Sequence, residues 1–396
     1  MDFTPWPCFE EDEIQAVVNV LKSGNVNQWT GNEVVSFEKE FSKYVGTEYS
    51  IALANGSLAL DLALRVLSIG KGDEVIVTPR SFIASVSCVV LAGAIPVFVD
   101  VDPISQNITL ESISKAVNSK TKAVIAVHLS GWPCEMDKIK SFCKQKKIVL
   151  IEDCAQAHGA EYNGKKVGSF GDCSIFSFCQ DKIMTTGGEG GMLLTNNKKI
   201  WEKVWSYKDH GKNYKKAFSN NHTPGFKWLI NSVGTNCRMT EMQAAMGRVM
   251  LGKLDKWVKK RRNFASFLNK AFMDIPGLRT AIPRDKEYHS YYKYYVFLNP
   301  DELKESWDRA AILEALNKNG ISCNTGICPE IYMEKVFENC THRLHGSRSD
   351  LKIPYLPVAK QLGETSMMFM VHPTLKLESI NYLIEQMKVI MEKAVK

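Results

Sequence analysis

One lysine, Lys182, stands in the segment SFCQDKIMTTGGEGGM, between a short apolar run and a cluster of glycines. A lysine amine in such a place can be a solvated surface charge, a phosphate ligand, or a nucleophile that forms an imine with a carbonyl cofactor. The glycines GGEGG could surround a phosphate, but no Gly-Lys-Ser or Gly-Lys-Thr follows them. We therefore expect GGEGG to form a tight turn before the strand MLLT.

Three further segments carry groups that would complement a lysine nucleophile. ANGSLAL places Gly56 and Ser57 between a strand and the start of a helix, where free N–H groups and the helix dipole attract an anion. VLIEDCAQAHG ends a strand with Asp153, whose carboxylate can face a crevice at the carboxyl edge of a parallel sheet. Ser177 precedes Lys182 by five positions and adds a hydroxyl group.

These residue types match what pyridoxal 5′-phosphate requires of a protein. A lysine forms the Schiff base, a carboxylate keeps the pyridine nitrogen protonated, and a helix N-terminus with hydroxyl groups holds the phosphate. The order strand–Gly-Ser–helix, strand–Asp, Ser–Lys is typical of such a site in an aminotransferase. Structural alternatives remain open at this point, since Lys182 could be a loop lysine, and Asp153 and Ser57 could simply cap helices.

Composition and charge exclude several other classes of protein. The 396 residues predict two or three domains. The 11 cysteines form no CxxC pair and the 8 histidines show no ligand spacing, so we expect reduced thiols and no metal. We also expect no signal peptide and no membrane span, hence a cytoplasmic location. The net charge of +7 is dispersed, which argues against nucleic-acid binding and suits an anionic small substrate.

The elements that must position these groups alternate regularly along the first part of the chain. Two helices are expected at 11–24 and 32–46, and strands alternate with helices from Tyr49 to Asp153. Val- and Ile-rich strands separated by helices predict a parallel sheet covered on both faces. A long helical stretch, Arg238–Phe272, then leads to an α+β remainder. We therefore expect a large domain at 1–250 and a small domain at 251–396.

At this point the chain resembles the DegT/StrS-type sugar aminotransferases. The motifs that carry the resemblance are DCAQAHGA, SFCQDKIMTTGGEGG and GTNCRMTEMQAA, in the order and spacing of that family. The resemblance implies an α/β fold of the fold type I pyridoxal phosphate class, with a mainly parallel, seven-stranded type of sheet between helices and a smaller α+β C-terminal domain. It also implies transfer of an amino group from L-glutamate to a keto sugar, for surface polysaccharide or lipopolysaccharide.

The resemblance also implies a role for each matching residue. Lys182 would be the Schiff-base lysine and proton shuttle, and Asp153 would pair with the pyridine nitrogen. The remaining cofactor contacts would come from Gln156 on the ring hydroxyl, Phe82 stacked on the ring, Gly56, Ser57 and Ser177 on the phosphate, and Asn236 on the phosphate of the neighbouring subunit. This last role would make the protein a homodimer with shared active sites. Structural alternatives stay open for three of these residues: a local structural role for Gln156, a place in the core for Phe82, and the shaping of a turn for Asn236.

The segments in which this sequence departs from the family are those expected to lie near the sugar substrate. Some relatives carry a His-Tyr-x-Pro segment where this chain reads NTGICPEIYME, and the residues Cys179-Gln180-Asp181 before the lysine also differ from commoner versions. A nucleotide-linked 4-keto or 3-keto deoxysugar is the expected substrate, and a keto sugar acid without a nucleotide, such as an oxidised octulosonate, stays open. A sugar dehydratase or lyase also stays open, as does a non-catalytic protein. In relatives that are sugar dehydratases, histidine replaces the Schiff-base lysine.

Overall fold

A large sheet forms the centre of the computed structural model, which describes residues 4–219, 229–345 and 355–396. Its strands are β1 (Tyr49–Leu53), β2 (Glu74–Val77), β3 (Ile95–Val99), β4 (Thr121–Val127), β5 (Val149–Asp153), β8 (Cys173–Ser177), β9 (Gly191–Thr195) and β14 (Arg343–His345). They lie in the order β1-β9-β8-β5-β4-β2-β3-β14. Within this sheet β9 runs antiparallel to both of its neighbours, and the other pairs are parallel.

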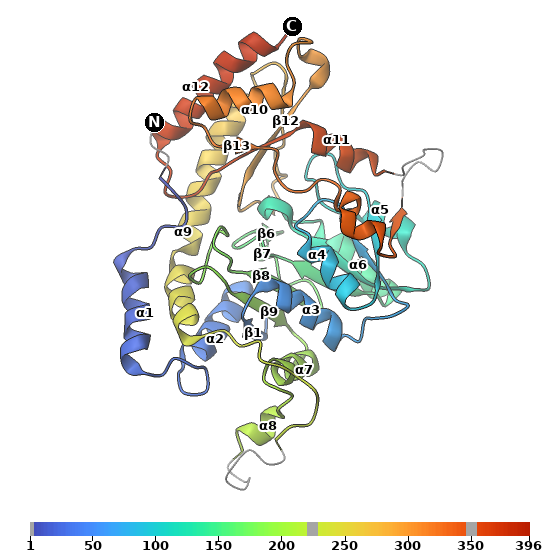
Figure 1. Cartoon of the computed structure of the whole chain (residues 1–396), viewed down its shortest axis with the longest axis vertical. Helices are drawn as coiled ribbons and strands as arrows, with labels where there is room; N and C mark the ends of the chain where they lie inside the picture. Colours follow the sequence, from blue (N-terminus) through green and yellow to red (C-terminus); the bar gives the residue numbers. More distant parts are fainter. Residues whose placement is uncertain (1–3, 220–228, 346–354) are drawn as a thin grey trace.

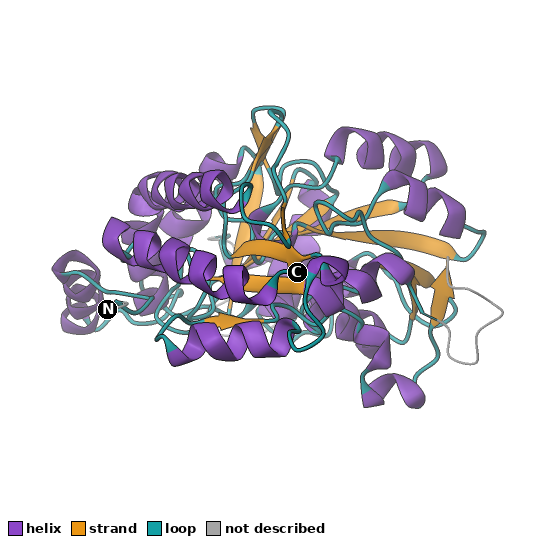
Figure 2. Cartoon of the chain, turned by 90° about the horizontal axis from the view of Figure 1, so that it is seen from above, coloured by secondary structure: helices purple, strands orange, loops and turns teal. Residues whose placement is uncertain are grey.

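Helices cover both faces of the sheet, as Figure 2 shows. One layer contains α3 (Gly56–Val66), α4 (Ala84–Leu91) and α7 (Lys198–Lys208); the other contains α2 (Glu33–Val45), α5 (Leu110–Ala116), α6 (Met136–Lys146) and the first half of α9 (Glu241–Phe272). Alternate strand residues face opposite layers because side chains in a strand point alternately up and down. In β2, Val75 and Val77 join the core of the first layer, and Ile76 joins that of the second. The expected α/β fold is therefore confirmed.

The long helix α9 connects the large sheet to a smaller α+β part (Figure 1). Its buried residues recur at helical spacing, from Ala244 to Phe272, and its two halves belong to two different hydrophobic cores. The second core lies between α9, α10 (Arg309–Lys318), α12 (Leu377–Ala394) and a four-stranded antiparallel sheet. The strands of that sheet are β10 (Leu278–Thr280), β12 (Tyr294–Leu298), β15 (Ser366–Phe369) and β13 (Cys323–Asn324).

Short elements complete the described chain. They are the helices α1 (Glu11–Ser23), α8 (Tyr214–Ala217) and α11 (Pro357–Thr365), the 3₁₀ turns η1 (Leu129–Gly131), η2 (Pro300–Glu302), η3 (Ile331–Met333) and η4 (Lys335–Glu338), and a small sheet of β6 (Glu161–Tyr162), β7 (Lys165–Lys166) and β11 (Glu287–Tyr288). No helix among these described residues is long and apolar enough to cross a membrane.

Two differences from the sequence-based expectations concern the C-terminal part. The strand β14 adds an eighth strand to the expected seven, and Arg343 fixes it to the sheet through an ion pair with Glu74. In addition, Ile331, Phe337 and Leu356 pack into the core of the large sheet rather than the smaller one. The division at residue 250 stays a prediction, and we propose that the described residues 331–345 and 355–362 belong structurally to the larger unit.

Candidate active site

A cavity of about 520 Å³ opens at the carboxyl ends of the central strands. Seven of the eight predicted cofactor residues line it: Gly56, Ser57, Phe82, Asp153, Gln156, Ser177 and Lys182. They come from segments that lie far apart in the sequence, and the parallel strands bring them together because these strands all end at one edge of the sheet.

The anion-binding end of the cavity is the N-terminus of α3. Asn55 caps this helix, since its side-chain oxygen accepts a hydrogen bond of 2.9 Å from Leu58 N–H. The amides of Gly56 and Ser57 are in the first turn, where backbone N–H groups have no partner within the helix. A Cβ atom on Gly56 would lie 2.8 Å from the Cβ of Ser177. Glycine therefore lets the helix start approach the Ser177 hydroxyl, which suits a shared phosphate.

Asp153 ends β5 with its carboxylate almost fully buried. The hydroxyl of Ser85 donates a 2.6 Å hydrogen bond to Oδ2, and Ala155 N–H donates one of 3.1 Å to Oδ1. Burial raises the pKa of this carboxyl, although the two hydrogen bonds and the charge of Lys182 act in the opposite direction. A cationic group in the cavity would stabilise the ionised form, so Asp153 suits a protonated ring nitrogen.

Gln156 is held by the turn η1. Its side-chain oxygen accepts a 2.8 Å hydrogen bond from Ser130 N–H. Ser130 is buried in the left-handed region with φ 57°, and its hydroxyl donates to the carbonyl of Lys293 at 2.7 Å. Backbone strain of this kind persists where the surroundings determine the conformation. The amide group of Gln156 is thereby oriented at the cavity wall.

Phe82 lies at the edge of the cavity with 59% of its surface exposed. A core phenylalanine would be buried, so the alternative of a simple core residue is wrong. An exposed aromatic face beside buried polar groups is suited to cover a planar ring.

Lys182 follows β8 in a loop that is fixed from two sides. Its N–H donates to the carbonyl of Cys179 at 3.1 Å, and its own carbonyl accepts a 2.8 Å hydrogen bond from the indole N–H of Trp6. The side chain is only 15% exposed, and Nζ lies 4.9 Å from the centre of the Tyr292 ring. The amine therefore points along the cavity wall rather than into bulk solvent, unlike an ordinary loop lysine.

The GGEGG segment is a tight turn, as expected. Gly187 and Gly188 have φ of 88° and 124°, which residues with a side chain rarely adopt. Gly188 O accepts a hydrogen bond from Gln180 N–H, which closes the loop around Lys182. A Cβ atom on Gly191 would lie 2.3 Å from the carbonyl oxygen of Asn55, so this glycine lets β9 pass close to the start of α3.

Asn236 is the predicted residue that the structure does not bring into this cavity. It is exposed, it forms an isolated bridge with Asp209, and its side-chain oxygen accepts a 3.2 Å hydrogen bond from Arg238 N–H. Its predicted contact would involve a second copy of the chain, and it stays a prediction.

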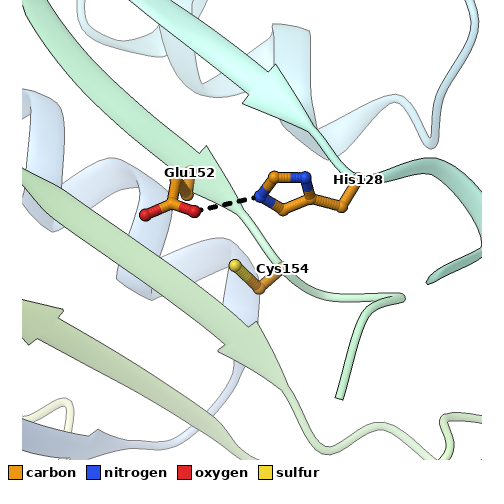
Figure 3. A group of neighbouring side chains, drawn as sticks. All are labelled: His128, Glu152 and Cys154. Atoms are coloured by element: carbon orange, nitrogen blue, oxygen red, sulfur yellow. Dashed lines mark hydrogen bonds and ion pairs between the residues drawn. The ribbon is translucent and has the colours of Figure 1, made fainter. Parts of the chain in front are cut away.

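A buried group of metal-binding residue types, His128, Glu152 and Cys154, lies at the carboxyl ends of β4 and β5 (Figure 3). The ligand atoms of His128 and Glu152 already take part in hydrogen bonds. Nδ1 of His128 accepts a hydrogen bond from Cys134 N–H and Nε2 faces Glu152 at 3.1 Å, while Glu152 also accepts bonds from the N–H groups of residues 168, 170 and 171. Burial raises the pKa of the Cys154 thiol far above its ordinary value. We interpret this group as a structural network that anchors the loop after β5.

The sequence reasoning missed several residues of the site. Ser85 supports Asp153, Ser130 supports Gln156, and Tyr292 forms part of the cavity wall. One signal was present for Ser85, which stands three positions after Phe82 and so about one helical turn away. No local pattern pointed to Ser130 or Tyr292, because their contacts come from strands and turns far away in the sequence.

Comparisons with known proteins agree with this geometry. The sequence pattern of the DegT/DnrJ/EryC1/StrS aminotransferase family matches residues 7–388. An aminotransferase of known structure from Psychrobacter cryohalolentis is 48% identical, with a TM-score of 0.93 and coverage of 99% of both chains. The GDP-perosamine synthase of Vibrio cholerae is 34% identical over 297 residues, which are 74% of this chain and 77% of that protein.

A dehydratase of the same fold is more distant. The structure of E. coli GDP-4-keto-6-deoxy-D-mannose-3-dehydratase with bound hydrated pyridoxal phosphate is 26% identical, with a TM-score of 0.85 and coverage of 96% of this chain and 98% of that one. The cofactor named there fits the residues found here: a helix N-terminus with hydroxyl groups, a buried carboxylate and a shielded lysine. With a match over nearly its whole length, the chain belongs to the DegT/DnrJ/EryC1/StrS aminotransferase family, enzymes of fold type I that use pyridoxal phosphate.

Proposed function

We propose that this aminotransferase transfers an amino group from L-glutamate to a nucleotide-linked keto sugar and so makes an amino sugar for a surface polysaccharide. The observation that carries the proposal is that Lys182, Asp153, Ser177 and the start of α3 line one and the same cavity. Relatives named for nucleotide sugars, such as the GDP-perosamine synthase, support the substrate class.

The residues of the cavity divide the work between holding the cofactor and moving protons. Pyridoxal phosphate, when bound, supplies the electron sink for the carbon that loses or gains a proton. Ser57 and Ser177 hold the phosphate, Asp153 keeps the ring nitrogen protonated, and Phe82 covers the ring face. Nζ of Lys182 would hold the cofactor covalently at rest and, once the amine of the donor has displaced it, would be the free base that moves the proton at the substrate carbon. A lysine at this position favours amino transfer over dehydration.

A second cavity supports a substrate larger than one sugar ring. It measures about 440 Å³ and shares Ser81, Phe82 and Ile327 with the first cavity. Its other side is formed by the segment 328–336, which includes one carboxylate, Glu334, one amine, Lys335, and several apolar side chains. We propose that the part of the substrate beyond the keto sugar lies here, with Lys335 close to its negative charge. This segment overlaps residues 324–334, NTGICPEIYME, which depart from the His-Tyr-x-Pro pattern.

We also propose that the enzyme is a homodimer that shares its active sites. Three apolar side chains within 18 positions of Asn236 in the sequence, Phe218, Ile230 and Val233, are exposed, and Val233 is 88% exposed. Apolar groups of this kind are typical of a surface that another subunit covers. A cytoplasmic location is supported by the cysteines, since all eleven are free thiols and most are buried.

A substrate screen tests the proposal. The purified enzyme is first converted to its amine form with L-glutamate, and release of 2-oxoglutarate is measured. Keto sugars with and without a nucleotide are then added, and the visible absorbance of the cofactor bound to Lys182 is followed. Its return only with nucleotide-linked keto sugars is the expected result. Return only with keto sugar acids would replace the proposed substrate, and a Lys182→Ala variant that still turns over would contradict the proposed site.

A further inference from the structure

The residue before the nucleophile, Asp181, has no role in the reaction described so far. It belongs to the Cys179-Gln180-Asp181 segment, in which the sequence departs from commoner members of the family. Its half-exposed carboxylate lines the same cavity as Lys182. Oδ1 of Asp181 lies 3.8 Å from Nζ of Lys182, and Oδ2 accepts a hydrogen bond from the hydroxyl of Tyr292. The aspartate is therefore fixed by a buried tyrosine beside the reactive amine.

A second amine faces the same carboxylate. Nζ of Lys293 lies 3.8 Å from Oδ2 of Asp181 and 4.6 Å from the centre of the Tyr292 ring. Burial lowers the pKa of Lys293 to about 8, although Asp181 acts in the opposite direction. Burial also acts on Asp181, but Lys182, Tyr292 and Lys293 together hold the pKa of its carboxyl below the ordinary value. One carboxylate thus lies between the reactive amine and a second, nearly buried amine.

Other charged groups near Lys182 act from greater distances. Among the described residues, no other carboxylate forms an ion pair with its Nζ. Asp153 interacts with Lys182 only electrostatically, and burial keeps His158 neutral by lowering its pKa to about 3. Arg261 donates a 3.2 Å hydrogen bond to the carbonyl of Tyr292, and its guanidinium lies over the ring of Trp6. Asp181 is therefore the negative charge that acts most directly on the amine.

We propose that Asp181 is a positioning residue that holds a proton on Nζ of Lys182, and that Lys293 opposes this effect. An opposite charge within about 4–6 Å favours the charged form of a group, and a like charge disfavours it. With the cofactor bound, a proton on Nζ would make the cofactor carbon bonded to it more electrophilic, and this would favour attack by the amine of the donor. The pair Asp181 and Lys293 would thus set the pH range in which the enzyme accepts its amino donor.

A pH titration of the cofactor-loaded enzyme tests this inference without any sugar substrate. The visible absorbance of the bound cofactor changes when Nζ of Lys182 loses its proton. Asp181→Asn should lower the midpoint of this change by about one pH unit, or tenfold in proton affinity, because a stabilising negative charge is lost. Lys293→Met should raise the midpoint. Glu189→Gln, which neutralises another carboxylate of the same cavity wall, should leave the midpoint unchanged.

The outcomes separate this inference from the proposed function on which it rests. If Lys182→Ala keeps the pH-dependent band, the role of Lys182 fails. If that variant loses the band while neither Asp181→Asn nor Lys293→Met moves the midpoint, only the role of Asp181 fails. A merely structural aspartate would change the melting temperature but not the midpoint, and Asp181→Glu should restore part of the shift. If Asp181→Asn does not take up the cofactor, Lys293→Met tests the inference alone. A higher midpoint of its absorbance change supports the inference, and an unchanged or lower midpoint contradicts it.

Discussion

Ser85 and Asp153 are joined by a 2.6 Å hydrogen bond between a hydroxyl group on α4 and a carboxylate at the end of β5. The two residues are 68 positions apart in the sequence. Because the carboxylate is buried, this bond orients it and offsets part of the cost of its charge. The relationship makes α4 part of the cofactor site, although none of the family motifs lies in that helix.

Replacing Ser85 by alanine should weaken cofactor binding. A hydrogen bond to a charged group contributes about 1.5–3 kcal/mol, so we expect affinity for pyridoxal phosphate to fall at least about tenfold. The dissociation constant can be measured from the visible absorbance during a cofactor titration. Ser87→Ala on the same helix is the matched control and should bind the cofactor normally. Equal affinities of the two variants would mean that Ser85 does not orient Asp153.

Gly56→Ala should destabilise the protein and weaken phosphate binding, because the new Cβ would lie 2.8 Å from the Cβ of Ser177. Overpacking of this kind typically costs about 1–3 kcal/mol. Gly252→Ala is the control, since nothing lies within 4 Å of its Cβ position on the exposed face of α9. That change should stabilise the chain by up to about 1 kcal/mol. Urea unfolding of both variants measures the free energy of unfolding, which should fall in Gly56→Ala and rise in Gly252→Ala.

Trp6→Phe should slow catalysis while keeping an aromatic ring at position 6. The change removes the indole N–H that donates to the carbonyl of Lys182, and leaves the packing against Trp257 and the buried Arg261 largely intact. One such hydrogen bond contributes about 1 kcal/mol, which corresponds to roughly a fivefold lower kcat. Trp257→Phe serves as the control because it changes the ring that packs against Trp6 but keeps the hydrogen bond from Trp6 to the Lys182 carbonyl. An unchanged kcat in Trp6→Phe would show that the N-terminal segment does not position the lysine.

The cofactor-free protein should lose stability in acid. Burial lowers the pKa of His158 and of His372 to about 3, whereas a histidine in the unfolded chain has a pKa of about 6.5. The unfolded chain therefore binds more protons than the folded one between these values, so stability falls as the pH drops below about 6.5. At pH 5 each histidine should account for about 2 kcal/mol.

His158→Leu tests this pH dependence. The variant should lose about 2 kcal/mol less than the native chain when the pH is lowered from 8 to 5. The leucine can pack between Phe176 and Phe178, where the histidine ring now lies. Urea unfolding at the two pH values provides the measurement, and comparison at pH 8 separates a packing defect from the proton effect. If the native chain and His158→Leu lost the same free energy of unfolding between pH 8 and pH 5, His158 would not be neutral and buried in the folded protein.

The sequence predicted those elements whose signal is local. Apolar runs such as Val75–Val77 identified the strands, and helical spacing from Ala244 to Phe272 identified the long helix. The helix α7 was missed because its residues are mostly charged or aromatic, and its apolar side is recognisable only where Trp201 and Trp205 pack against the sheet. The strand β14 was missed because three residues give no periodic pattern, and only its pairing with β3 defines it.

By itself the sequence determined the reactive groups of this protein: a lysine after Ser177, an aspartate ending a strand, and a Gly-Ser pair at a helix start. Residue type and the neighbouring backbone decide such properties, so local patterns carry them. Only the tertiary structure decided how these groups are supported. The hydrogen bond from Trp6 to Lys182 spans 176 positions, and that from Tyr292 to Asp181 spans 111. Contacts of this length depend on how the sheet and α9 place distant loops together, which no local pattern encodes.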